Sequence, residues 1–129
     1  MMQNLFKSLL GFGLMLLFFA CNQGGKDSAA ESEMAKNLIG TWQSTDDPKS
    51  VVKIADGQYI DEYDGKEVSS LPYVFYPACP KDCNPVGTIP CLKLVGQDDV
   101  CYTLVHVDAK NLELSLISGR GNTNRYVRK

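Results

Sequence analysis

The chain contains five cysteines, the residue type that can form disulfides, bind metals or take part in redox catalysis. Setting Cys21 aside leaves Cys79, Cys83, Cys91 and Cys101. An even number in a small exported domain favours two disulfides, each contributing ~2–4 kcal/mol to a fold with a limited core. All three pairings stay open. A regular hairpin disfavours a bridge from Cys91 to Cys101, because residues that begin adjacent strands lie at opposite ends, but a bulge would remove that objection.

Metal binding and redox catalysis are the alternative uses of these cysteines. The segment Cys79-Pro80-Lys81-Asp82-Cys83 superficially resembles a copper-chaperone motif. That motif needs a helix after its first cysteine, and the proline-rich surroundings exclude one. A four-cysteine zinc site would need close cysteine pairs, which this spacing does not offer. We therefore expect neither a metal site nor a cofactor.

His106 is the single histidine, so a serine-histidine-aspartate triad would have to use it. It lies between two valines in an expected strand, where it should face outward, and no strained nucleophile motif accompanies it. We therefore expect no catalytic residue and no enzyme. A calcium site near Asp61 and Asp64 is an alternative without the ligand spacing of a calcium loop. The other reading treats the acidic residues beside expected turns as solvated turn carboxylates: Asp46, Asp47, Asp61, Glu62, Asp64, Asp98 and Asp99.

The elements that must position these residues are short strands. After residue 37, short runs of alternating apolar residues follow one another between turn signals, and Asp56-Gly57 and Asp64-Gly65 predict tight hairpins. Residues 77–90, PACPKDCNPVGTIP, hold four of the six prolines and must form a loop. Pro72 should break the strand before that loop. The expected strands cover residues 38–44, 51–55, 58–63, 67–76, 91–95, 100–107, 112–117 and 123–128.

About eight strands joined by short links indicate an all-β sandwich or an up-and-down barrel. The absence of a long crossover in this pattern favours a meander over a Greek key. A closed meander also removes the free edges that invite aggregation. We expect a small, up-and-down antiparallel β-barrel.

The N-terminal segment has the pattern of an export signal. Lys7 is the one charge before residue 21, and residues 8–20 are apolar after a leading serine. This run is shorter than the ~20 residues that a spanning helix needs, and it ends in a small residue. Residues 1–20 are therefore predicted to be a signal peptide.

Phe18-Phe19-Ala20-Cys21 resembles a bacterial lipobox. The resemblance implies that Cys21 is acylated, with chains such as palmitate, and anchors the protein to a membrane. One acyl chain holds only marginally, so several are needed for firm anchoring. Residues 21–37 are rich in Gly, Ser, Ala and charge, which predicts a flexible linker, with a short helix over residues 29–35 as the alternative.

Gly40-Thr41-Trp42, the strand 112–117 and the closing segment 120–128 together resemble the small lipocalin-like lipoproteins of Gram-negative bacteria, within the calycin group. The resemblance covers residues 38–129. It implies that an arginine of the last strand lies across Trp42 and closes one end of the barrel. We assign that role to Arg128, because residues 124, 126 and 128 share a face and Tyr126 suits the interior. Arg125 then points outward.

Four tyrosines are candidates to face a ligand inside the barrel. The domain is shorter than that of well-known lipocalins, so the alternative is that these residues and Trp42 simply fill the core. The candidates are Tyr59, Tyr63, Tyr102 and Tyr126.

The sequence thus predicts a non-catalytic binding protein, lipid-anchored in the cell envelope at the outer membrane of a Gram-negative bacterium. A small apolar ligand would occupy the barrel mouth. The alternative is a protein–protein module, an inhibitor or envelope adaptor, that uses the loop over residues 77–91. The net charge is −2 and no basic patch stands out, so we expect no nucleic-acid partner.

Overall fold

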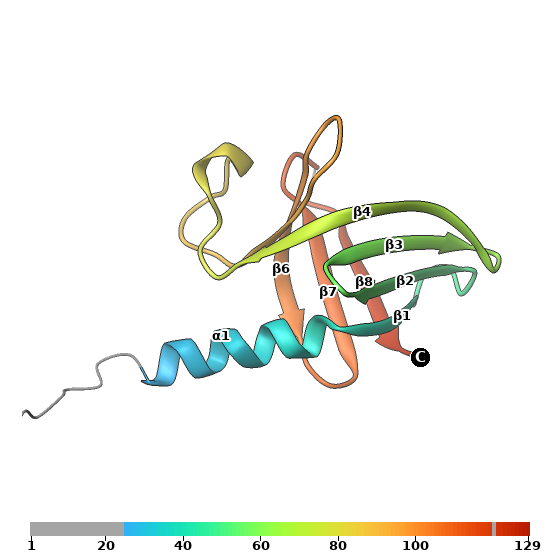
Figure 1. Ribbon diagram of the computed structural model, residues 1–129, viewed down its shortest axis with the longest axis horizontal. Helices are drawn as coiled ribbons and strands as arrows, with labels where there is room; N and C mark the ends of the chain where they lie inside the picture. The colour runs from blue at the N-terminus through green and yellow to red at the C-terminus, as the bar shows by residue number, and fades with distance from the viewer. Residues whose placement is uncertain (1–24, 120) are drawn as a thin grey trace, which may run out of the picture.

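Eight antiparallel strands close into a barrel in chain order, with β1 paired to β8 (Figure 1). The computed structural model describes residues 25–119 and 121–129, with side chains from residue 29 onward. The expected signal peptide and Cys21 lie outside the described residues. The strands are β1 (Gly40–Ser44), β2 (Ser50–Ala55), β3 (Gln58–Tyr63), β4 (Lys66–Tyr76), β5 (Cys91–Leu94), β6 (Val100–Val107), β7 (Asn111–Leu116) and β8 (Thr123–Arg128). The predicted up-and-down barrel is confirmed.

Two tight hairpins set the register of the first half of the barrel. Asp56 and Gly57 have φ values of 52° and 75°, and Asp64 and Gly65 have φ values of 52° and 80°. Positive φ at both central residues is the signature of the type I′ turn, whose twist matches that of the strands it joins. The Asp-Gly pairs predicted these turns because Gly adopts positive φ at no steric cost.

Inward-facing side chains of the strands pack the interior of the barrel. β7 shows the alternation most clearly, since Leu112 and Leu114 are fully buried while Asn111 is exposed and Glu113 is half-buried. One cluster fills the inside of the barrel: Leu38, Trp42, Val52, Ile54, Tyr59, Leu92, Leu94, Leu104, Leu112, Leu114 and Tyr126. The interior therefore supplies stability, and little of it is left over for a deep ligand cavity.

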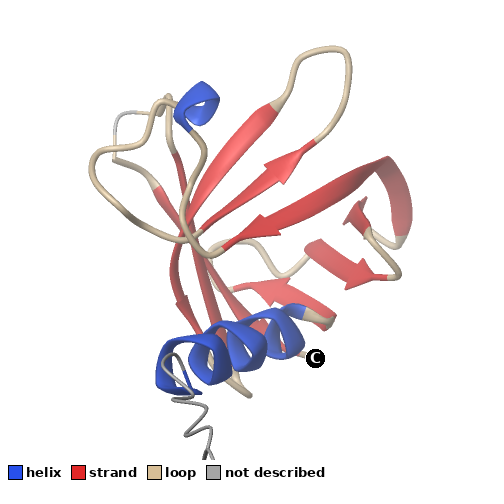
Figure 2. Cartoon of the chain, turned by 60° about the vertical axis from the view of Figure 1, so that its left-hand side comes forward, coloured by secondary structure: helices blue, strands red, loops and turns tan. Residues whose placement is uncertain are grey.

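The segment predicted to be a flexible linker is instead largely a helix, α1 (Gly25–Leu38). Its sequence is rich in Ala, Glu and Lys, which are strong helix formers. Leu38 is fully buried and Met34 packs against the core, so tertiary contacts hold the helix in place. Figures 1 and 2 show α1 across the barrel end where β8 finishes. Within the described residues, no helix is long and apolar enough to cross a membrane.

Pro72 does not interrupt β4, contrary to the sequence prediction. It lies opposite Gln58, the first residue of β3, and the next pairs of β4 are made with β5. Its carbonyl accepts a hydrogen bond from the Val95 amide at 2.8 Å. Pro72 thus sits where β4 passes from one partner strand to the other, and its missing N–H donor removes no ladder bond that the strand needs.

Candidate functional site

One end of the barrel is closed by Trp42 and Arg128, as the sequence predicted. Trp42 is fully buried, and its indole Nε1 donates to the Leu38 carbonyl at 2.9 Å. The guanidinium Cζ of Arg128 lies 4.3 Å from the centroid of the Trp42 ring. The guanidinium also donates to three backbone carbonyls: Ala109 at 2.6 Å, Ile39 at 2.9 Å and Asn37 at 2.7 Å.

Gly40 makes this closure sterically feasible. A Cβ at this position would clash with Nη1 of Arg128, and its φ of +153° is one that L-residues rarely adopt. The arginine thus ties the last strand to the end of α1 and to β1, and this end of the barrel is closed by structural contacts.

Three of the four candidate tyrosines lie inside the barrel. Tyr59 and Tyr126 are buried, and Tyr102 is half-buried. The rings of Tyr59 and Tyr102 stack with 6.3 Å between centroids and 17° between planes. Burial raises the pKa of all three phenols, that of Tyr126 to about 12.

Tyr63 does not belong to this group, so the sequence prediction is wrong for it. Tyr63 is the last residue of β3 and pairs with Ser50, the first residue of β2, and with Lys66, the first residue of β4. Its side chain is 48 % exposed. A hydrogen bond to the Asp47 carboxylate is the main cause that raises the pKa of Tyr63. This residue belongs to the surface around the β1–β2 connection.

Sequence reasoning missed Asp61 as an interior residue. The sequence predicts a solvated turn carboxylate at this position, but Asp61 lies within β3, two residues after Tyr59, and so shares the inward face. It pairs in register with Val52 and Ser69, and it accepts a hydrogen bond from Ser69 Oγ at 3.2 Å. Burial raises the pKa of Asp61, and the Ser69 hydrogen bond offsets this only in part.

The signal that would have placed Asp61 is simple alternation from Tyr59. The neighbouring Asp64-Gly65 turn favours the opposite prediction, because acidic residues near turns are usually solvated. Asp64 itself occupies that exposed turn, so the two carboxylates face different surroundings. The structure does not bring them together as a calcium site.

Two disulfides fasten the 77–90 loop to the barrel wall, and the expectation of two bridges is confirmed. Cys79 pairs with Cys91 and Cys83 with Cys101, with Cα separations of 5.2 Å and 5.7 Å. The Sγ atoms of Cys79, Cys83 and Cys91 lie within 4.8 Å of one another. Each of these sulfurs is bonded to another cysteine in this structure, and a disulfide sulfur is not the thiolate that metals bind.

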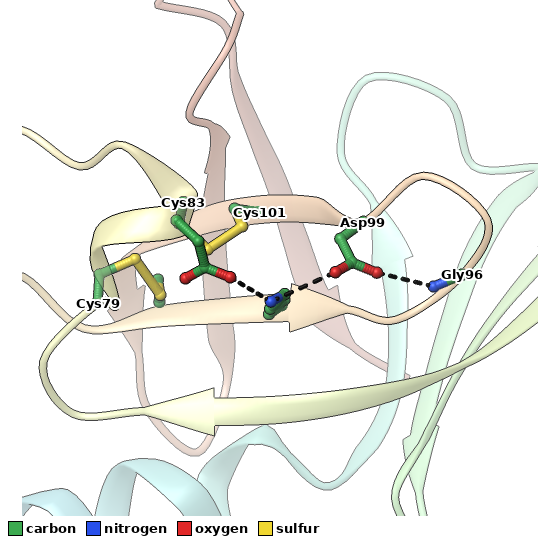
Figure 3. Close-up of a disulfide and its surroundings, with 8 residues drawn as sticks. Cys79, Cys83, Gly96, Asp99 and Cys101 are labelled. Carbon is green, nitrogen blue, oxygen red and sulfur yellow. Dashed lines mark hydrogen bonds and ion pairs between the residues drawn. A yellow bond between two sulfur atoms is a disulfide. The ribbon is translucent and has the colours of Figure 1, made fainter.

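A lysine adds a polar fastening to the same loop, shown in Figure 3. Lys93 Nζ pairs with the carboxylates of Asp82 and Asp99, the latter at 3.3 Å, and Asp99 also accepts from the Gly96 amide. Asp82 belongs to the short 3₁₀ helix η1 (Lys81–Cys83). The hydrogen bond between them raises the pKa of Lys93 and lowers that of Asp82. The loop is therefore held in one position over β5 and β6.

A cleft of about 580 Å³ opens between this loop and the rim of the barrel. The rim is the end away from α1 (Figure 2). Its apolar wall comes from the start of β6 and the end of β7, and its polar wall comes from the loop and the adjoining turns. The side chains that line the cleft include Val100, Tyr102, Leu116, Ile117, Asp82 and Asp99. Tyr102 links the cleft to the tyrosines inside the mouth.

His106 faces outward, as expected. It pairs with Glu113 across the outer surface of β6 and β7, and its Nε2 lies 2.7 Å from Asp108 Oδ2. Asp108 also accepts from the backbone amides of Lys110 and Asn111. These contacts lower the pKa of Asp108, with the His106 hydrogen bond as the largest cause. The arrangement stabilises the β6–β7 turn.

The chain matches no protein-family model, no curated protein and no solved structure.

Proposed function

We propose that this protein is a non-catalytic binding protein, lipid-anchored at Cys21 to the outer membrane of a Gram-negative bacterium, which holds a small ligand at the mouth of its barrel. The resemblance to small lipocalin-like lipoproteins and the lipobox-like segment before Cys21 support the location and the class. The observation that carries the binding role is the rim cleft, whose volume of about 580 Å³ lies in the range of small-molecule sites, ~300–1,000 Å³.

The packed interior decides where the ligand lies. Buried side chains already occupy the space between the closed end and the tyrosines. A ligand is therefore held at the rim, with its apolar part against Val100, Tyr102 and Leu116 and its polar part toward the loop. The Cys83–Cys101 disulfide forms part of the cleft wall, so the site is preorganised and binding loses less conformational entropy.

A neutral aromatic probe tests this proposal. We expect 2-phenylethanol to bind the processed full-length protein in nanodiscs saturably and with one-to-one stoichiometry, as measured by isothermal titration calorimetry with empty nanodiscs as the blank. Val100→Trp should fill the cleft and weaken binding by at least ~10-fold. Val127→Trp, on the outer face of β8, is the matched control and should bind normally. Non-saturable binding, or equal affinity in both variants, contradicts the proposal.

A protein–protein module is the second candidate, favoured by the tip of the 77–90 loop. Val86 is 93 % exposed, and the loop that presents it is held by two disulfides. An exposed apolar residue on a rigid loop suits insertion into a partner protein. A photo-crosslinking amino acid at Val86 should then give one discrete protein adduct in cells. The same amino acid at Val68, which is 68 % exposed on the β3–β4 hairpin, should give none.

A further inference from the structure

We infer that the two disulfides of the 77–90 loop form one exchange site for a small thiol. The thiol enters the rim cleft and opens the Cys83–Cys101 bridge. The freed Cys83 then exchanges with the neighbouring Cys79–Cys91 bridge. This activity goes beyond the proposed ligand binding and is independent of it. It is inferred from the close approach of sulfur atoms that belong to different bridges.

The sulfurs of the two bridges lie next to each other. The Sγ atoms of Cys79, Cys83 and Cys91 are within 4.8 Å of one another. Cys83 is nevertheless bonded to Cys101 and so belongs to the other bridge. Figure 3 shows both bridges side by side, where η1 meets β5 and β6. Thiol–disulfide exchange needs a thiolate that can reach a disulfide sulfur. A thiolate at Cys83 is therefore placed to attack the second bridge with little movement of the loop.

Cys101 is the end of its bridge that a thiol can reach. Cys83 and Cys101 both line the rim cleft of about 580 Å³. Cys83 is only 6 % exposed, whereas Cys101 is half-buried. A thiolate that attacks Sγ of Cys101 forms a mixed disulfide there and breaks the bond to Cys83. The bonding electron pair leaves with Cys83, which becomes a thiolate beside the second bridge.

The second step moves the break to the other bridge. The Cys83 thiolate attacks Sγ of Cys91, so a Cys83–Cys91 bond forms. The Cys79–Cys91 bond breaks, and the electron pair leaves with Cys79, which takes up a proton. Attack at Cys79 would instead release the thiolate of Cys91, which is fully buried and poorly solvated. The number of disulfide bonds is the same before and after both steps, so the thiol is the one reactant consumed.

Exchange transfers the free thiol to a different cleft. Cys79 is half-buried and lines a second cleft of about 380 Å³, together with Lys81, Asn84 and Gly87. A nearby ammonium such as that of Lys81 favours a thiolate. A reaction that begins in the rim cleft therefore exposes a reactive sulfur elsewhere on the loop.

Two single substitutions place a thiol inside or outside the group of three sulfurs. Cys101→Ser leaves the thiol on Cys83, inside the group. Cys83→Ser removes the same bridge and leaves the thiol on Cys101, which does not belong to the group. Each full-length variant is kept at pH 8, labelled with N-ethylmaleimide, digested without reductant and mapped by mass spectrometry. Circular dichroism melts verify that both variants fold.

The two variants should give different maps. In Cys101→Ser, we expect a Cys83–Cys91 bridge, with label at Cys79 at least ~3-fold above label at Cys83. In Cys83→Ser, we expect an intact Cys79–Cys91 bridge and label at Cys101. Label that stays mainly on Cys83 in the first variant overturns the inference. Exchange in both variants also overturns it, because an unfolded chain would let either thiol reach the second bridge.

The unsubstituted protein gives a second, independent test. It is treated briefly with 2-mercaptoethanol and then labelled, and the species that carries one thiol adduct is mapped. We expect the adduct on Cys101 and the label on Cys79. An adduct on Cys101 with the label on Cys83 would show that the break is not passed on. An adduct on Cys79, or no adduct while the protein remains folded, would show that the rim cleft does not admit the thiol. Each of these results contradicts the exchange site.

Discussion

At the scale of single residues, Arg128 shows how a side chain near the end of the chain can be essential to the fold. Terminal residues are usually dispensable. Here the guanidinium stacks on Trp42 and donates to carbonyls of α1, the α1–β1 connection and the β6–β7 turn. These contacts join the first helix to the last strand, so the residue fastens both ends of the folded chain.

Arg128→Ala should therefore lower the free energy of unfolding by about 2 kcal/mol. This exceeds the range of a partly desolvated cation–π contact alone, because the carbonyls also lose a charged donor. Arg125→Ala is the control, since that side chain is 62 % exposed and its ion pair with Glu113 contributes less than ~0.5 kcal/mol. Urea denaturation measures both variants. Equal losses would show that the Trp42 contact does not carry the closure.

Asp61 should make stability depend on pH in an uncommon direction. Burial raises the pKa of Asp61 in the folded protein above its unfolded value, so the folded state binds the proton more tightly. The contribution of Asp61 to the free energy of unfolding therefore falls as the pH rises from the unfolded pKa through the folded pKa. Asp61→Asn should be the more stable protein at pH 7, by roughly 0.5–1 kcal/mol after allowance for the part that water still reaches.

Urea denaturation at pH 4 and pH 7 tests this expectation. The stability difference between Asp61→Asn and the unsubstituted protein should shrink at the lower pH, because a larger fraction of Asp61 is protonated there than at pH 7. A difference that is the same at both pH values, or one in favour of the unsubstituted protein, would mean that Asp61 is well solvated or paired.

Residue-level prediction worked wherever a strand is regular. Alternation placed Tyr126 and Arg128 on the inward face and Arg125 outside, because successive side chains of a strand point to opposite faces. It failed at Tyr63, because this residue ends β3 beside the β3–β4 turn, where the side chain stays exposed although the alternation of β3 continues. It failed at Asp61 because composition near a turn was given more weight than alternation.

At the scale of elements, α1 shows that amino-acid composition alone does not always predict secondary structure. Its residues look like a linker because few of them are apolar, and a helix of this length is marginal by itself in water. The structure holds it through Met34 and Leu38 against the core and through carbonyls bonded to Trp42 and Arg128. Those contacts are tertiary, so the local sequence could only suggest a short helix.

The two disulfides should contribute similarly to stability but differently to binding, and two double substitutions test this difference. Replacing Cys83 and Cys101 with serine removes a bridge that closes 18 positions of chain, and should lower stability by about 3 kcal/mol. Because this bridge forms part of the cleft wall, the variant should also bind 2-phenylethanol more weakly.

Replacing Cys79 and Cys91 with serine is the matched comparison. This bridge closes 12 positions, so a similar loss of stability is expected, with a smaller effect on binding. Thermal melts and calorimetry give both readouts. If the two double variants bind the probe equally weakly, the loop position as a whole matters more than the cleft wall.

At the scale of the whole molecule, strand count and turn spacing were enough to predict a closed eight-stranded meander. They could not show that the interior is filled, because the space inside a barrel depends on how side chains of all strands pack together. They also could not place the cleft, which exists only because a long loop is bonded back over the rim.

A substitution at Cys21 tests the proposed membrane location of the whole molecule. Cys21→Ser should yield an unacylated protein that is released into the soluble fraction, because several acyl chains together provide firm membrane attachment. Intact-mass analysis of the unsubstituted protein, purified from the envelope, is the direct measurement. A mass that corresponds to an unmodified Cys21 with residues 1–20 still attached would contradict the lipid anchor.

The pairing of β1 with β8 affects the order in which the protein folds. Ile39 and Arg128, which meet across this seam, are 89 positions apart in the chain. Synthesis of the chain from its N-terminus delivers β1 first and β8 last. Until β8 arrives, the earlier strands form at most an open sheet with bare edges at β1 and β7, which is where chains stick to one another. Closing the seam is thus both the slow, non-local step of folding and the step that removes the free edges at which the chain could aggregate.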